Sequence, residues 1–236
     1  MPRIAENSSP GYQVLPGLSC RIVASGLFFV CVLLMAAPSQ AFEKLTAAQS
    51  LVYDRAHLSN TTAGQQIVYG YRGQVTPDEI IEDQVVLKVS KEHADNRRDV
   101  ALEFLSAERR MFLPDFTAYR GNPVIIAMLE HIAQNLGRTT GGGVLYFRNR
   151  IRDALATHEV GIEAVDTEYN GQAVDATRIT FMPFVGDSYL AQQPEYTAAN
   201  FSVLLSDHVP GGVVGIAARS GQNGESQFVY EIVINQ

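Results

Sequence analysis

The chain has 236 residues, of which 46% are apolar, and its formal net charge is −7. This length and this apolar content are enough for one globular domain with its own hydrophobic core. The negative charge disfavours unspecific binding to nucleic acid and to anionic membrane surfaces, so we expect no nucleic-acid partner.

The first 41 residues have the layout of a secretory signal peptide. A 16-residue apolar run follows Arg21 and precedes the small residues Ser39 and Ala41. This order of charge, short apolar core and small cleavage-site residues is typical of signal peptides, whereas a membrane span needs about 20 apolar residues. We therefore predict a signal peptide over 1–41 and a single mature α+β domain over 42–236. The layout predicts no stable membrane span after cleavage, and a periplasmic or secreted location in a Gram-negative bacterium.

Cysteine and histidine usage disfavours several kinds of site. Both cysteines, Cys20 and Cys31, lie in the predicted signal peptide, so the mature chain has no disulfide, thiolate nucleophile or cysteine metal ligand. The histidines are scattered and lack the spacing that is typical of metal ligands. We therefore predict no metal and no cofactor. The five histidines are His57, His93, His131, His158 and His208.

The first half of the mature chain alternates between apolar and polar residues in the way that half-buried strands do. An amphipathic helix precedes these strands, and Pro114 follows the last of them. The predicted elements are a helix over 44–58, strands over 66–74, 84–90 and 99–105, a charged turn over 91–98, and a short strand over 111–113.

The middle of the chain is predicted to be helical. Asn122 is a favourable N-cap, and Pro123 suits the first helical position because its missing N–H costs nothing there. Apolar residues then recur at helical spacing as far as Leu136, and we expect Gly137 to end the helix. More than half of this helix surface is apolar, so it should be nearly engulfed. A second helix is predicted over 145–156, with Phe147, Ile151 and Leu155 facing inward.

Two polar features accompany these helices. Gly141–Gly143 precedes the second helix, which carries Arg148 and Arg152, and a helix N-terminus beside arginines could bind an anion. We favour the alternative, a flexible linker beside a solvated basic face, because no Lys or Ser stands at the turn. His131, next to Glu130, is interpreted as a core or rim histidine, since buried polar groups usually find a hydrogen-bond partner.

The last third returns to strands joined by hairpins. Asn170-Gly171 is the strongest two-residue hairpin signal, and Pro210-Gly211 and Asn223-Gly224 mark further turns. The predicted strands are 160–169, 172–182, 201–206, 213–219 and 228–234.

This order of elements predicts an α+β fold with an antiparallel sheet. Eight or nine strands do not lie flat, so the sheet should curl into a half-barrel. We expect it to wrap around the central apolar helix over 124–136, with the second helix alongside.

We find no catalytic motif in the mature chain. It lacks a nucleophile elbow, a His-Glu-x-x-His zinc motif, a phosphate loop and a dinucleotide fingerprint. An alternative comes from 68–73 and 76–81, which resemble the opening of ADP-ribosyltransferase toxins. That resemblance implies an NAD-dependent enzyme with Arg72 as dinucleotide anchor and Glu195 as catalytic acid. The chain lacks the Ser-Thr-Ser strand of those enzymes, and Pro194 interrupts the acidic motif.

Several blocks resemble exported proteobacterial proteins of unknown function. They are 104–114, 121–123 with the following helix, 146–152, 205–207 and 209–212. In addition, the late hairpin, in which one strand ends in Ser-Asp and a Pro starts the next, is similar to periplasmic carriers of the LolA/LolB lipoprotein-localisation type. That resemblance implies a half-barrel around helices, an apolar cavity for acyl chains, and a binding or carrier role.

These observations favour a non-enzymatic periplasmic protein that binds or carries an apolar small molecule, or that assists an envelope protein. A structural assembly factor acting through a strand edge is a further alternative. For any one residue, close packing competes with cavity lining, because protein interiors seldom contain voids. The candidate cavity residues are Tyr69, Leu87, Phe104, Ile125, Met128, Leu129, Ile132, Phe147 and Phe201.

Overall fold

The computed structural model describes residues 44–76, 79–157, 159–222 and 225–236. The predicted signal peptide over 1–41 lies outside the described residues, as do His158 and the predicted Asn223-Gly224 turn. The described residues from Lys44 onward belong to one compact unit.

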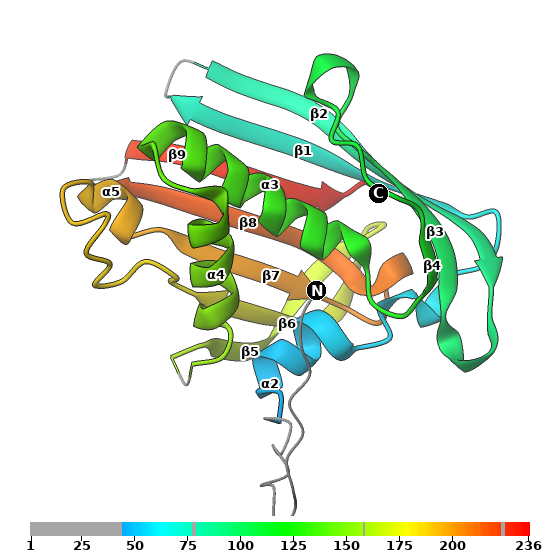
Figure 1. Cartoon of the computed structure of the whole chain (residues 1–236). Coiled ribbons are helices and arrows are strands. Elements are labelled where there is room, and N and C mark those ends of the chain that lie inside the picture. Colours follow the sequence, from blue (N-terminus) through cyan, green and yellow to red (C-terminus); the bar gives the residue numbers. More distant parts are fainter. Residues whose placement is uncertain (1–43, 77–78, 158, 223–224) are drawn as a thin grey trace, which may run out of the picture. The chain divides into compact units, whose positions relative to one another are not determined.

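Nine strands in the described ranges form one antiparallel sheet, which confirms the predicted α+β class (Figure 1). The spatial order is β4-β3-β2-β1-β9-β8-β7-β6-β5, so the first and last strands pair at its centre and the sheet is open. The strands are β1 Gln66–Thr76, β2 Glu79–Glu92, β3 Arg98–Phe104, β4 Phe116–Tyr119, β5 Gly161–Tyr169, β6 Gln172–Phe181, β7 Asn200–Leu205, β8 Val213–Gln222 and β9 Glu225–Ile234.

Helices α3 and α4 lie on the same face of this curved sheet (Figure 1). Eleven of the 18 residues of α3 are buried, as its mostly apolar surface predicts. Helix α4 packs against α3 and turns Phe147 and Ile151 inward, as expected, and Leu155 at its C-cap is also buried. The helices are α2 Ala47–Gln49, α3 Pro123–Thr140, α4 Val144–Ala154 and α5 Pro194–Thr197, joined by short turns η1 Ser50–Asp54, η2 His57–Asn60, η3 Ala94–Asn96, η4 Ala107–Arg109 and η5 Pro210–Gly212.

The start of α3 is the one predicted. The side-chain oxygen of Asn122 accepts a hydrogen bond from the backbone N–H of Val124 at 3.0 Å, and Pro123 occupies the first turn. The predicted end at Gly137 is wrong, because the helix continues to Thr140 and ends at Gly141 with φ +75°. A Cβ on Gly137 would lie 3.0 Å from the carbonyl oxygen of Gly142. Gly137 therefore serves close packing between the helices rather than termination.

The predicted helix over 44–58 is also wrong in its extent. The chain forms only the short α2 and η1 before Arg55 adopts extended backbone. The imidazole Nε2 of His57 then bonds the carbonyl oxygen of Leu51 at 2.9 Å. In a continuous helix the carbonyl oxygen of Leu51 would accept a hydrogen bond from a backbone N–H. Here the side chain of His57, which follows the break, provides the donor instead.

The predicted short strand over 111–113 is reduced to one bridge between Met111 and Phe104. The edge strand lies further along, in β4, which the sequence pattern did not reveal. The predicted strands of the last third are confirmed, and the turn between β5 and β6 has φ 51° at Asn170 and 72° at Gly171. These left-handed values match the turn that Asn-Gly favours.

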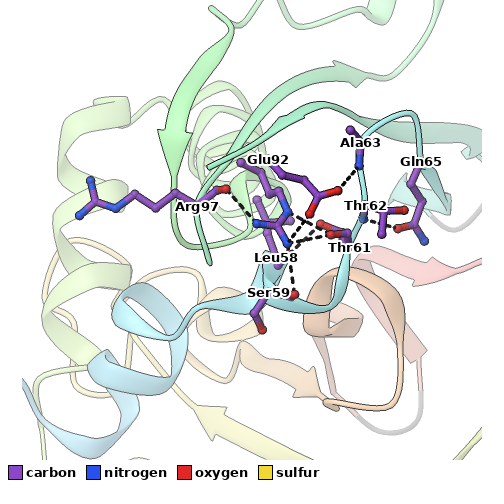
Figure 2. Close-up of polar contacts among 9 residues, drawn as sticks. Leu58, Ser59, Thr61, Thr62, Ala63, Gln65, Glu92 and Arg97 are labelled. Atoms are coloured by element: carbon purple, nitrogen blue, oxygen red, sulfur yellow. Dashed lines mark hydrogen bonds and ion pairs between the residues drawn. The ribbon is translucent and has the colours of Figure 1, made fainter. Parts of the chain in front are cut away.

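The predicted charged turn over 91–98 contains a buried arginine at its end. Arg98 begins β3, is only 5% exposed, and donates hydrogen bonds to the carbonyl oxygens of Thr61, Ser59 and Arg97. Glu92 lies 3.6 Å away and accepts a bond from the backbone N–H of Ala63 (Figure 2). Arg98 therefore ties the segment before β1 to the sheet.

Candidate functional site

A cavity of about 810 Å³ lies between α3 and the strands β1, β2 and β9. Strands β1 and β9 are adjacent in the sheet, although they come from the two ends of the described domain. The segment between β3 and β4 and the first residue of α4 complete the wall. The lining residues are Tyr71, Glu79, Ile81, Leu105, Glu108, Arg109, Arg110, Met111, His131, Gln134, Asn135, Arg138, Thr139, Val144 and Tyr230.

Aromatic and aliphatic side chains provide an apolar surface in this cavity. Tyr71 and Tyr230 are 4% and 2% exposed, and burial raises the pKa of both phenols above the ordinary value of 10. Both hydroxyls therefore stay protonated at neutral pH. The partly buried Ile81, Met111 and Val144 pack against the same hydrophobic core.

A chain of hydrogen bonds runs along α3 and reaches β1. Arg138 donates to the side-chain oxygen of Asn135, which fixes the orientation of the amide. The amide nitrogen of Asn135 then lies 3.0 Å from Nε2 of His131 and 2.8 Å from its carbonyl oxygen. The hydroxyl of Tyr71 lies 2.8 Å from the same Nε2.

This chain determines the tautomer of His131. Because the amide of Asn135 is a donor, Nε2 of His131 must be an acceptor, and the ring proton sits on Nδ1. The ring lies between Tyr71, Phe104 and Tyr230, with centroid distances of 5.4, 5.3 and 5.9 Å. Burial, and then the positive charge of Arg138, lower the pKa of His131 to about 4. His131 is therefore neutral, and its place in the cavity wall agrees with the rim interpretation.

Three arginines line the cavity, and they differ in their partners. Arg109 forms an ion pair with the carboxylate of Asp83 at 3.2 Å. Arg110 lies 5.6 Å from the centroid of Phe112. Neither Arg110 nor Arg138 forms an ion pair with a carboxylate of the described residues.

The nine candidate residues from the sequence are all buried, at 0–7% exposure. None of them is among the residues that line this cavity. Phe104 lies directly behind the wall, against the ring of His131. Tyr71, His131, Arg138 and Tyr230 were not among the candidates. The apolar alternation around Tyr71 and Tyr230 was a signal, but it does not reveal that β1 pairs with β9.

A second cavity, of about 520 Å³, lies beside β5, β6 and β7. Its wall includes Asp166, Asp175 and Asp207, while Arg55 forms an ion pair with Asp207. Such a wall is acidic and offers little apolar surface. Within the described ranges, no group of three or more His, Cys, Asp or Glu residues is arranged to hold a metal ion.

Arg72 and Glu195, the two residues of the ADP-ribosyltransferase alternative, do not line the same cavity in the described part of the chain. Arg72 is exposed and alternates with Tyr71 along β1, so it points to the face opposite α3. Glu195 lies in α5, which packs on β8. The arginines beside Gly141–Gly143 are also engaged, because Arg148 pairs with Glu130 and Arg152 with Asp153.

No helix in the described part of the chain is both long and apolar enough to span a bilayer. No protein-family model and no curated protein matches the sequence.

Three solved structures show distant similarity. The lipoprotein LppX of Mycobacterium tuberculosis has 9% identity and a TM-score of 0.34, with 80% of this chain and 93% of LppX covered. LprF of Mycobacterium bovis has 9% identity and a TM-score of 0.28, covering 80% and 91%. A LolA superfamily protein of Nitrosomonas europaea has 10% identity and a TM-score of 0.22, covering 81% and 92%. At these TM-scores the similarity assigns no family and no function.

Proposed function

We propose that this protein is an exported, non-enzymatic binding protein that holds an apolar small molecule in the cavity between α3 and strands β1, β2 and β9. The observation that carries this proposal is the cavity of about 810 Å³ with Tyr71 and Tyr230 in its wall. Small-molecule sites usually occupy 300–1,000 Å³ and combine apolar walls with a few convergent polar groups.

Several features support a binding role over catalysis. The histidine in the wall is neutral, and its Nε2 already lies within hydrogen-bond distance of the Tyr71 hydroxyl and the Asn135 amide. Arg72 and Glu195 lie in separate parts of the fold. The proposed location is the periplasm, and it rests on the signal-peptide layout of 1–41.

The nine buried candidates have a supporting place in this proposal. Phe104 lies behind His131, and Ile132 and Met128 are fully buried along α3. We propose that they hold the cavity wall in position and become ligand contacts only where the ligand reaches past His131. Binding to an envelope protein remains the alternative for a protein that takes up no small molecule.

An uncharged fluorescent probe, N-phenyl-1-naphthylamine, tests the proposal. The full chain is expressed with its own leader, and binding is measured on the purified protein. Thr139→Trp places a large ring in the cavity wall and should weaken probe binding at least about tenfold, or about 1.4 kcal/mol. Ile126→Trp is the matched control, because Ile126 is exposed on the same helix and does not line the cavity.

Equal binding by the wild type and by both variants would place the probe elsewhere and contradict the proposed site. Absence of binding by the folded wild-type protein would contradict the proposed function. The position at which the leader is cleaved, read from the intact mass of the purified chain, tests export separately.

A further inference from the structure

The cavity wall presents hydrogen-bond donors that have no acceptor within the described ranges of the chain. Arg138 is exposed, and its one hydrogen bond to a described residue goes to the side-chain oxygen of Asn135. A guanidinium carries five N–H donors, so most of them are free to bind a ligand. On His131, the protonated Nδ1 has no hydrogen-bond partner among the described side chains and backbone groups.

The guanidinium of Arg138 lies close to the apolar surface of the cavity. Burial raises the pKa of Tyr71 and Tyr230, and the positive charge of Arg138 lowers it by a smaller amount. In His131, burial and then the charge of Arg138 both lower the pKa. Arg138 lines the same cavity as Tyr71 and Tyr230, so its charge lies beside the surface that an apolar ligand would contact.

Among the residues that the structure describes, Arg138 forms no ion pair with a carboxylate. Arg109 is neutralised by Asp83, whose carboxylate also accepts bonds from Ser106. Glu79 and Glu108 are the carboxylates of the wall, and neither forms an ion pair with Arg138. With His131 neutral, the remaining cations at the wall are Arg110 and Arg138.

We propose that the ligand is an amphipathic anion, whose carboxylate or phosphate group is bound by the guanidinium of Arg138 while its hydrocarbon chain lies against Tyr71 and Tyr230. This inference rests on the proposed function and adds the chemical class of the ligand. Arginine is suited to the role because its planar fork matches two oxygens of a carboxylate or phosphate.

Competition between ligands that differ only in their head groups tests this inference. Dodecanoate, dodecyl phosphate, dodecanol and dodecyltrimethylammonium displace the bound N-phenyl-1-naphthylamine in a titration at low salt. The wild-type protein should bind at least one of the two anions about tenfold or more tightly than dodecanol. The anion that binds more tightly then identifies the head group as carboxylate or phosphate.

Variants of Arg138 separate charge recognition from general binding. Arg138→Gln should abolish the preference for the anion, so that the anions and dodecanol bind with affinities that differ by less than about twofold. Arg138→Glu should reverse the preference in favour of dodecyltrimethylammonium. Arg152→Gln is the matched control, since Arg152 is an exposed arginine that pairs with Asp153 and does not line the cavity.

The outcomes distinguish this inference from the proposed function. A wild-type protein that binds dodecanol and dodecanoate equally would overturn the anion inference and leave the binding function intact. Persistence of the anion preference in both Arg138 variants would also overturn it. Failure of every probe to bind would overturn the proposed function itself.

Discussion

The side-chain amide of Asn122 donates a 2.8 Å hydrogen bond to the carbonyl oxygen of Gly211, and thereby joins the start of α3 to the turn before β8. The same amide nitrogen lies 3.2 Å from the hydroxyl of Tyr69, while the amide oxygen caps the helix at Val124. One buried side chain therefore positions the helix that carries Asn135, His131 and Arg138 against the sheet.

Asn122→Ala should lower the free energy of unfolding by about 2–4 kcal/mol, because the helix loses its cap and the carbonyl of Gly211 loses a buried donor. Urea unfolding followed by circular dichroism measures this change. Asn200→Ala is the control, since Asn200 is exposed at the start of β7, and surface substitutions usually change stability by less than about 0.5 kcal/mol. Equal stability of the two variants would refute the role of Asn122.

Arg98 should be needed to hold the segment before β1 on the sheet. Arg98→Met removes the donors to the carbonyl oxygens of Ser59 and Thr61, and we expect a loss of about 2–4 kcal/mol, because the buried carbonyl of Thr61 is left unpaired. Amide exchange over residues 57–63 should rise more than exchange in β7. In the control Arg97→Met, an exposed pair with Asp95 is lost, which should cost at most about 1 kcal/mol.

Stability should fall as the pH is lowered from about 6.5 to about 4. Burial lowers the pKa of both His57 and His131 from 6.5 to about 4. Between these pH values the unfolded chain binds protons that the folded chain does not, so acid favours unfolding. Each histidine contributes roughly 3 kcal/mol over this range. Above about pH 7 both states are neutral at these positions, and this contribution no longer changes.

The variant His131→Gln should remove about one proton from the pH dependence of stability in that window. Urea unfolding at several pH values measures the slope, and the ring signals in NMR spectra give the pKa directly. A ring of His131 that titrates near 6.5 in the folded protein would contradict the assignment of a neutral, buried imidazole.

The glycine pair of η5 offers a test of close packing. Gly212 has φ +71°, and an added Cβ would lie 3.2–3.3 Å from backbone atoms of His57. Gly186 has a similar φ of +68° with open space around it. Gly186→Ala should therefore cost only the left-handed strain of about 1–2 kcal/mol, and Gly212→Ala should cost at least about 1 kcal/mol more. Equal unfolding free energies of the two variants would contradict the prediction, because they would show that His57 moves away from the added Cβ at no cost in stability.

Local signals in the sequence predicted most of the secondary structure. Alternating apolar residues located the main strands, Asn170-Gly171 located a hairpin, and Asn122-Pro123 located the start of α3. Each of these signals acts over a few neighbouring residues, through side-chain alternation, turn dihedrals or a cap. Gly137 was expected to end α3, but the helix continues past it. The close contact that glycine allows at this position outweighs its low helix propensity, which costs about 1 kcal/mol.

The sequence by itself therefore determined the α+β class, the antiparallel strands and the engulfed helix. Only the tertiary structure decided which buried residues pack and which line a cavity. Phe104 and Ile132 share the apolar spacing that marks a core, whereas the cavity wall depends on β1 pairing with β9 and on the position of α3 across them. Arg98 shows the same limit, because its burial depends on contacts with Ser59 and Thr61, which are far away in the chain.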